Sequence, residues 1–171
     1  MVVDLEPIRE GLRRAGADAI WVHPGVDLRH LTGLNPLALE RPTALVVLAD
    51  GGLRTLAPAM LAPELGEIEG ADLVAWTDAD GPDAAIARVL DGVGRLLVGD
   101  ALPTAFAFAI QAARPAIELA LDPGILAARA SASGQTSSST CAPPAATPTP
   151  RPRGSPGSRS PAAASATSRS R

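Results

Sequence analysis

The stretch TALVVLADGGLRTLAP, residues 43–58, decides how the fold is interpreted. Its first half, residues 43–50, is a nearly continuous apolar run of the length of one strand, and residues 53–58 form a second short run. The Asp-Gly-Gly between them supplies residues that readily adopt the backbone conformations of a tight turn. The stretch therefore predicts two antiparallel strands joined as a hairpin.

The residues before this hairpin predict a helix, a strand and a short second helix. Leu5, Ile8 and Leu12 recur at spacings of three and four residues, with Asp4 as N-cap and Gly16 after the last turn, which predicts an amphipathic helix over residues 4–15. DAIWVHP, residues 18–24, is typical of a short buried strand. Residues 26–34 end at a glycine and predict one or two helical turns.

Beyond the hairpin, predicted helices and strands alternate. The helical patterns cover residues 59–68, 82–93 and 103–113, and the strand patterns cover residues 72–77, 95–100 and 116–121. Strands that alternate with helices of 10 to 14 residues indicate a parallel sheet covered by helices on both faces. The sequence therefore predicts an α/β fold with about six strands, mostly parallel but mixed because of the hairpin.

The composition changes abruptly near residue 129. All 18 acidic residues precede it, whereas residues 130–171 contain no Asp, Glu, Leu, Ile, Val, Met or aromatic residue. Ten of the 15 arginines lie before residue 130, so the first part carries a net charge of −8 and the last part +5. We expect an α/β domain over residues 1–128 and a disordered low-complexity segment over residues 129–171.

Location and membrane contact can also be predicted from the sequence. No apolar run approaches the roughly 20 residues that span a bilayer, and the N-terminus lacks the pattern of a secretory signal. The single cysteine, Cys141, has no partner for an internal disulfide. We expect a cytoplasmic protein that does not contact membranes.

Four segments, taken in order, resemble the N-terminal domain of the creatinase/prolidase family, which includes Xaa-Pro dipeptidases and aminopeptidases. They are LRRAGADAIWV (12–22), DLRHLTGL (27–34), ERPTALVVLADGG (40–52) and LLVGD (96–100), and the resemblance extends over about residues 5–128. It implies a mixed α/β domain that helps to form a homodimer. In the family, a following catalytic domain holds two divalent metals, Mn²⁺, Co²⁺ or Zn²⁺, on two Asp, one His and two Glu.

None of those metal-ligand motifs occurs in this chain. The resemblance therefore implies a truncated Xaa-Pro peptidase-like protein that binds no cofactor and is inactive alone. A proline-containing peptide is expected as a ligand only of a full-length protein. The alternative is a stand-alone α/β interaction domain that pairs with itself or with a full-length homologue.

Residues 130–171 are open to two interpretations. Read in another frame, their codons permit Lys, Pro, Glu, an aliphatic residue, Leu-Arg and Ala at the spacing of the helix that opens the family's catalytic domain. This predicts a frameshift near residues 127–131. The other interpretation is a natural basic tail, although five arginines without aromatic residues are a weak signal for nucleic acid, which we do not expect as a partner.

Arg41 is the predicted substrate-binding residue. It precedes the strand of residues 43–50, and its planar guanidinium suits a carboxylate such as the C-terminus of a dipeptide. The alternative is a surface ion pair with Glu40 or another acid. We expect His23 and His30 to serve packing or the surface rather than a metal, because no third ligand lies nearby at metal spacing.

The remaining distinctive residues carry weaker signals. Gly99 and Asp100 follow a predicted strand, where α/β sheets often bind ligands, but no dinucleotide-binding glycine pattern accompanies them. Trp21 and Trp76 fall within predicted strands, and we expect both in the core. Cys141 has no neighbouring base that would mark it as a nucleophile.

Overall fold

The predicted hairpin joins β2 (Ala44–Leu48) to β3 (Leu53–Pro58) at the centre of the structure. The structure, a computed structural model, describes residues 4–37 and 40–128. In the turn, Gly51 adopts φ of +108°, a conformation that favours glycine, and the Gly52 N–H donates to Asp50 Oδ1 at 2.9 Å. The Asp-Gly-Gly signal is thus confirmed. The predictions for residues 129–171, Cys141 among them, concern residues outside the described part.

Six strands form one mixed sheet in the order β4-β3-β2-β1-β5-β6. The other four strands are β1 (Ala19–Val22), β4 (Ala71–Trp76), β5 (Arg95–Val98) and β6 (Glu118–Leu121). β2 pairs antiparallel with both β1 and β3, whereas the pairs β3–β4, β1–β5 and β5–β6 are parallel. The predicted fold class, a mixed and mostly parallel sheet of about six strands, is confirmed.

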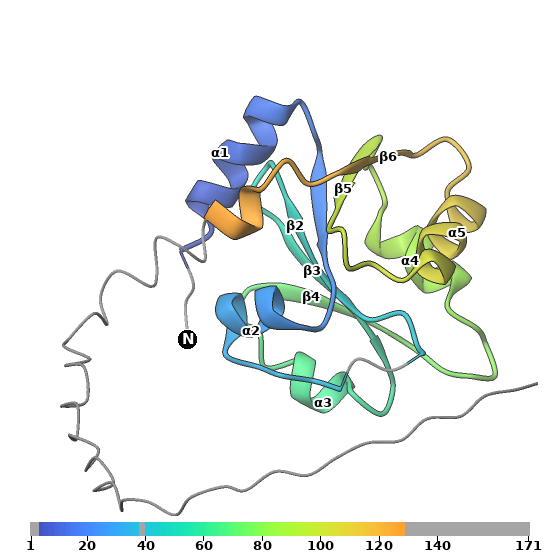
Figure 1. Cartoon of the computed structure of the whole chain (residues 1–171). Helices are drawn as coiled ribbons and strands as arrows, with labels where there is room; N and C mark the ends of the chain where they lie inside the picture. The colour runs from blue at the N-terminus through green and yellow to red at the C-terminus, as the bar shows by residue number, and fades with distance from the viewer. Residues whose placement is uncertain (1–3, 38–39, 129–171) are drawn as a thin grey trace, which may run out of the picture. The chain divides into compact units, whose positions relative to one another are not determined.

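Helices cover both faces of this sheet (Figure 1). The helices α1 (Glu6–Ala15), α2 (Val26–Thr32) and α3 (Ala62–Leu65) lie on one side, and α4 (Asp83–Val89) and α5 (Thr104–Ala113) lie on the other. Side chains of β1 alternate between the two faces: Ala19 and Trp21 join the core under α4 and α5, while Ile20 and Val22 join the core under α1 and α2. Burial on both faces explains why this strand is uniformly apolar.

The helix boundaries differ from the predictions in two places. α1 begins at Glu6 with Leu5 in the cap position, although Asp4 Oδ1 still accepts a hydrogen bond from the Glu6 N–H at 3.1 Å. α3 covers four residues where residues 59–68 were predicted, because Pro63 in its first turn prevents extension upstream and Gly66 ends it. Gly16 ends α1 in the left-handed conformation, as expected.

Candidate functional site

The strand directions bring two of the singled-out residues, His23 and Arg41, to one edge of the sheet together with Asp78. Every strand except β2 runs in the same direction, so the end of β1, the end of β4 and the start of β2 lie at the same edge. His23 follows β1, Asp78 follows β4 shortly after its last residue, and Arg41 precedes β2. This is the carboxyl edge, where α/β sheets commonly bind ligands.

Arg41 forms a two-point ion pair with Asp78 at this edge. Its Nε donates to Asp78 Oδ1 at 2.9 Å and its Nη2 donates to Oδ2 at 2.7 Å. The hydrogen bond from Arg41 holds the pKa of the Asp78 carboxyl below its ordinary value, and the same contact raises the pKa of Arg41. Both side chains face solvent, so the guanidinium is accessible and already holds a carboxylate in the bidentate geometry.

Trp76 fixes the backbone that presents Arg41. The indole Nε1 donates to the Pro42 carbonyl at 3.1 Å, and the Thr43 hydroxyl donates to the Arg41 carbonyl at 3.1 Å. Trp76 and Trp21 are both buried in the core, as predicted from the sequence. The Trp76 hydrogen bond to the start of β2 is a positioning contact that the sequence pattern does not reveal.

His23 packs against Phe106, and its pKa is lowered. The ring is half-buried and meets Phe106 edge-on, with ring centroids 5.5 Å apart at 61°. Burial lowers the pKa of His23, and a hydrogen bond with the Thr43 backbone opposes this shift. The imidazole is therefore held toward its neutral form beside the start of β2. His30, by contrast, is exposed on α2.

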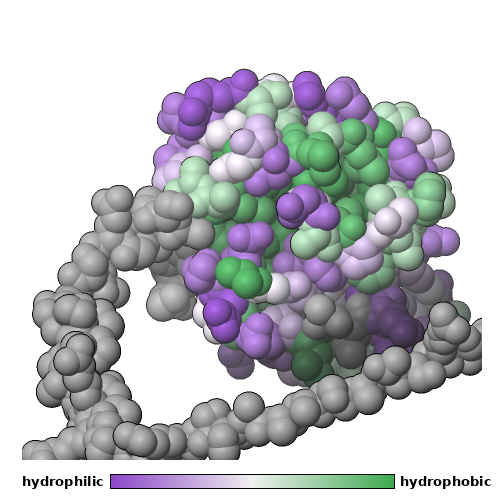
Figure 2. All heavy atoms as spheres, viewed as in Figure 1, coloured by the Kyte–Doolittle hydropathy of each residue, from purple (hydrophilic) through white to green (hydrophobic). Residues whose placement is uncertain are grey.

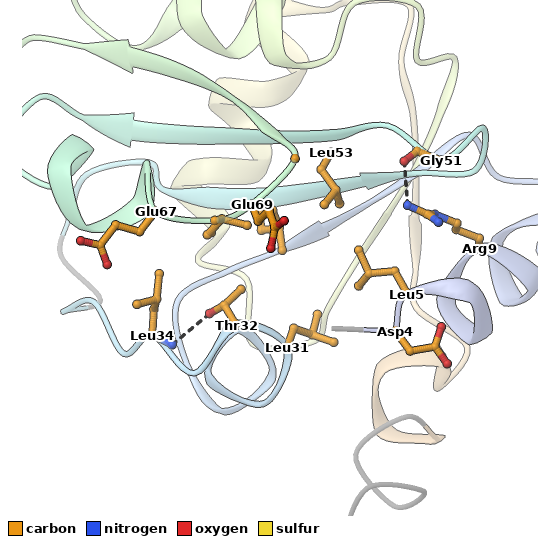
Figure 3. Close-up of a pocket in the computed structure, with 13 residues that line it drawn as sticks. Asp4, Leu5, Arg9, Leu31, Thr32, Leu34, Gly51, Leu53, Glu67 and Glu69 are labelled. Carbon is orange, nitrogen blue, oxygen red and sulfur yellow. Dashed lines mark hydrogen bonds between the residues drawn. The ribbon is translucent and has the colours of Figure 1, made fainter. Parts of the chain in front are cut away.

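A pocket of about 650 Å³ lies away from this edge, between α1, α2 and the hairpin turn (Figure 3). Aliphatic side chains form much of its wall, namely Leu5, Leu31, Leu34, Leu45, Leu53 and Ile68. Its polar lining comes from Asp4, Arg9, Thr32, Glu67 and Glu69, and two glycines complete it. Nothing in the sequence pattern marks this pocket, because its walls come from five separate segments.

Within residues 4–37 and 40–128, no group of three or more His, Cys, Asp or Glu side chains is arranged to hold a metal ion. No helix in the same part of the chain is long and apolar enough to cross a membrane. Gly99 and Asp100 follow β5, and among these residues neither forms a hydrogen bond or an ion pair with Arg41 or His23.

Comparison with known proteins agrees with the resemblance inferred from the sequence. The profile of the creatinase/prolidase N-terminal domain family matches residues 5–127. A prolidase from Thermococcus sibiricus is 25% identical with a TM-score of 0.64, and the match covers 72% of this chain and 35% of the prolidase. A dipeptidase from Pyrococcus horikoshii is 27% identical with a TM-score of 0.59, and the match covers 70% of this chain and 33% of that chain.

A third structure shows the fold alone. It is a proline dipeptidase chain from Streptococcus pneumoniae, 24% identical with a TM-score of 0.67, and the match covers 74% of this chain and 97% of that chain. This chain thus spans about a third of the length of the two archaeal proteins and nearly all of the streptococcal chain. A comparison with curated protein sequences gave no match.

Proposed function

Because the chain belongs to the creatinase/prolidase N-terminal domain family, we propose that it serves as the dimerisation and substrate-gating domain of an Xaa-Pro peptidase-like protein and has no peptidase activity alone. The observation that carries this proposal is the family match over residues 5–127, which occupies nearly all of the described fold. The proposal includes a cytoplasmic location, which a single cysteine in the chain favours.

A hydrolysis assay tests the proposed inactivity. The purified chain is incubated with Ala-Pro and with Mn²⁺, Co²⁺ or Zn²⁺ in turn, and release of free proline is measured. We expect no release above that of the metal ion alone, with a complete prolidase as the positive control. Metal-dependent release that EDTA abolishes and that co-purifies with the chain would contradict the proposal.

The outer face of α5 supports the proposed dimerisation. No charged side chain occurs between Asp100 and Arg114, although α5 is a surface helix. Phe108 is 66% exposed, and the exposed Ala105 and Ala112 flank it at three and four residues. In Figure 2, green side chains gather toward the upper right of the surface, where β5 and β6 lie in Figure 1, and paler ones continue toward α5. An exposed aromatic on an uncharged helix face is typical of a protein contact.

We propose that this face, hereafter the α5 face (Ala105, Phe108 and Ala112), packs against the α5 face of a second copy. Small residues on both sides of Phe108 leave room for the Phe108 ring of the partner, so the surface is self-complementary. A contact between two ten-residue helices is small, so we expect a dissociation constant on the order of 100 µM.

Phe108→Glu is expected to weaken self-association by about tenfold or more, because it replaces the central aromatic with two charges facing each other across the twofold axis. Met60→Glu is the matched control, since Met60 is 64% exposed but lies next to α3 on the other side of the sheet. Sedimentation equilibrium measures both variants. An equal effect of the two substitutions would place the contact elsewhere.

For Arg41 we propose a carboxylate-binding role in the full-length context. The bidentate pair with Asp78 supports this, because Asp78 occupies the guanidinium as a substrate carboxylate would. Exchange of one carboxylate for another needs no burial of charge, since both partners are accessible.

Asp78→Asn is expected to increase the affinity of the chain for Ala-Pro by about 2- to 5-fold, because Arg41 loses its internal competitor. Binding is measured by NMR, from the shift of the Arg41 Nε–H resonance as Ala-Pro is added. Asp80→Asn is the control, since Asp80 accepts a hydrogen bond from the Thr77 hydroxyl, whereas the ion pair of Arg41 is with Asp78. Identical titrations of the wild type and Asp78→Asn would refute the substrate role and leave a surface ion pair.

For residues 130–171 we retain the proposal of a frameshift near residues 127–131. Its support is the abrupt loss of acidic and aliphatic residues in the sequence, together with codons that permit the family's next helix in another frame. Sequencing the gene through and beyond this region is the test. An alternate frame that runs on into the Asp, Asp, His, Glu and Glu ligand motifs is expected. Early stop codons in that frame would favour a natural tail.

A further inference from the structure

The pocket between α1, α2 and the hairpin turn has a long apolar wall. Leu31 belongs to α2, and Leu34 follows the end of that helix by two residues. Leu53 belongs to β3, and Leu5 precedes α1 (Figure 3). Leu34 is held by a hydrogen bond from its N–H to the Thr32 hydroxyl at 3.1 Å. The cavity measures about 650 Å³, a volume that can hold a short alkyl chain.

Arg9, the one basic residue in the pocket lining, already contacts neighbouring residues. Arg9 Nη2 donates to the Gly51 carbonyl at 2.7 Å, and Arg9 Nη1 lies 3.8 Å from Glu6 Oε2. Figure 3 shows the Arg9 side chain reaching toward Gly51 in the hairpin turn. The guanidinium therefore fixes α1 to the turn through Nη2, whereas the Arg9 Nε is buried and has no hydrogen-bond partner among the described residues.

Glu69 is the carboxylate that faces the apolar wall. In Figure 3 it lies between Leu53 and Leu31, whereas Glu67 points away from the other labelled residues. Within residues 4–37 and 40–128, Glu69 has no ion-pair partner. With Asp4 and Glu67 also in the lining, acids outnumber the one engaged arginine.

We propose that this pocket binds a primary amine that carries an aliphatic chain. The ammonium group pairs with Glu69, and the chain lies against Leu31, Leu34 and Leu53. The charge of the lining selects a cation over an anion, and the aliphatic wall selects an alkyl amine over a small hydrated cation. This binding site is separate from Arg41 and from the α5 face, so it does not depend on the proposed function.

Three probes of equal chain length test the proposal. n-Hexylamine, n-hexanol and hexanoate are titrated into the ¹⁵N-labelled chain at low ionic strength, and amide shifts are followed. We expect hexylamine to bind with a dissociation constant on the order of millimolar, hexanol several-fold more weakly and hexanoate most weakly, with shifts in residues 31–34, 53 and 67–70. Equal affinity of the three probes, or hexylamine shifts confined to other residues, would overturn the proposal.

Variants separate the charge from the apolar wall. Glu69→Gln keeps the shape of the side chain and is expected to weaken hexylamine binding by about 2- to 5-fold while leaving hexanol unchanged. Glu64→Gln removes the same charge from α3, outside the pocket lining, and is expected to have no effect. Leu34→Ser is expected to weaken both ligands. A loss with Glu64→Gln as large as with Glu69→Gln would show only a general effect of net charge.

Discussion

Replacing Trp76 by alanine is expected to lower the free energy of unfolding by about 3–5 kcal/mol, as for other buried aromatic residues. Trp76 is 7% exposed and packs in the core under α4 and α5, so its removal leaves a large cavity. It also removes the hydrogen bond to the Pro42 carbonyl, which holds the start of β2. Chemical denaturation with urea, followed by circular dichroism, measures the change.

Two further variants identify the origin of this loss. Trp76→Phe keeps most of the ring volume but leaves the Pro42 carbonyl without its donor, so we expect a loss of about 1–3 kcal/mol. Leu73→Ala, on the same strand but 37% exposed, is expected to cost about 1 kcal/mol. A loss for Trp76→Ala no larger than that for Leu73→Ala would contradict the packing of β4 against the core.

Leu12→Ala is expected to cost about 2–5 kcal/mol, because Leu12 is fully buried where α1 packs on the sheet. Leu5 and Ile8 belong to the same core, so α1 is held chiefly by this apolar stripe. Loss of Leu12 is also expected to loosen α1 in hydrogen exchange ahead of α4 and α5, which pack in the other core.

Glu10→Ala is the matched control on the same helix. Its carboxylate lies 3.9 Å from Arg14 Nε, with both side chains largely exposed, so its removal is expected to change stability by less than about 0.5 kcal/mol. Comparable losses for Leu12→Ala and Glu10→Ala would mean that α1 is not docked on the sheet as described.

Local patterns in the sequence were sufficient to predict most of the fold. The hairpin follows from Asp50, Gly51 and Gly52, whose turn conformations depend on neighbouring residues alone. The order of the strands in the sheet could not be read from these patterns, because pairing β1 between β2 and β5 joins segments far apart in the chain. The length of α3 was overestimated because its apolar residues suggested a helix that Pro63 and Gly66 confine to one turn.

The candidate sites were less predictable because they depend on contacts between distant segments. Arg41 and Asp78 lie 37 residues apart, and only the parallel pairing of β3 with β4 brings Asp78 to the edge where β2 begins. The two-point contact makes Asp78, and not Glu40, the acid that Arg41 holds through hydrogen bonds. Glu69 carries no motif, and its relation to Leu53 and Leu31 exists only in the folded chain.

Sedimentation equilibrium of the unmodified chain tests the central claim, that this family domain acts by pairing with a second copy. The chain is measured from about 10 µM to about 500 µM, a range that brackets the expected dissociation constant. We predict a reversible shift from monomer to dimer within this range, independent of added metal. A chain that stays monomeric throughout, at either low or moderate salt, would contradict the account.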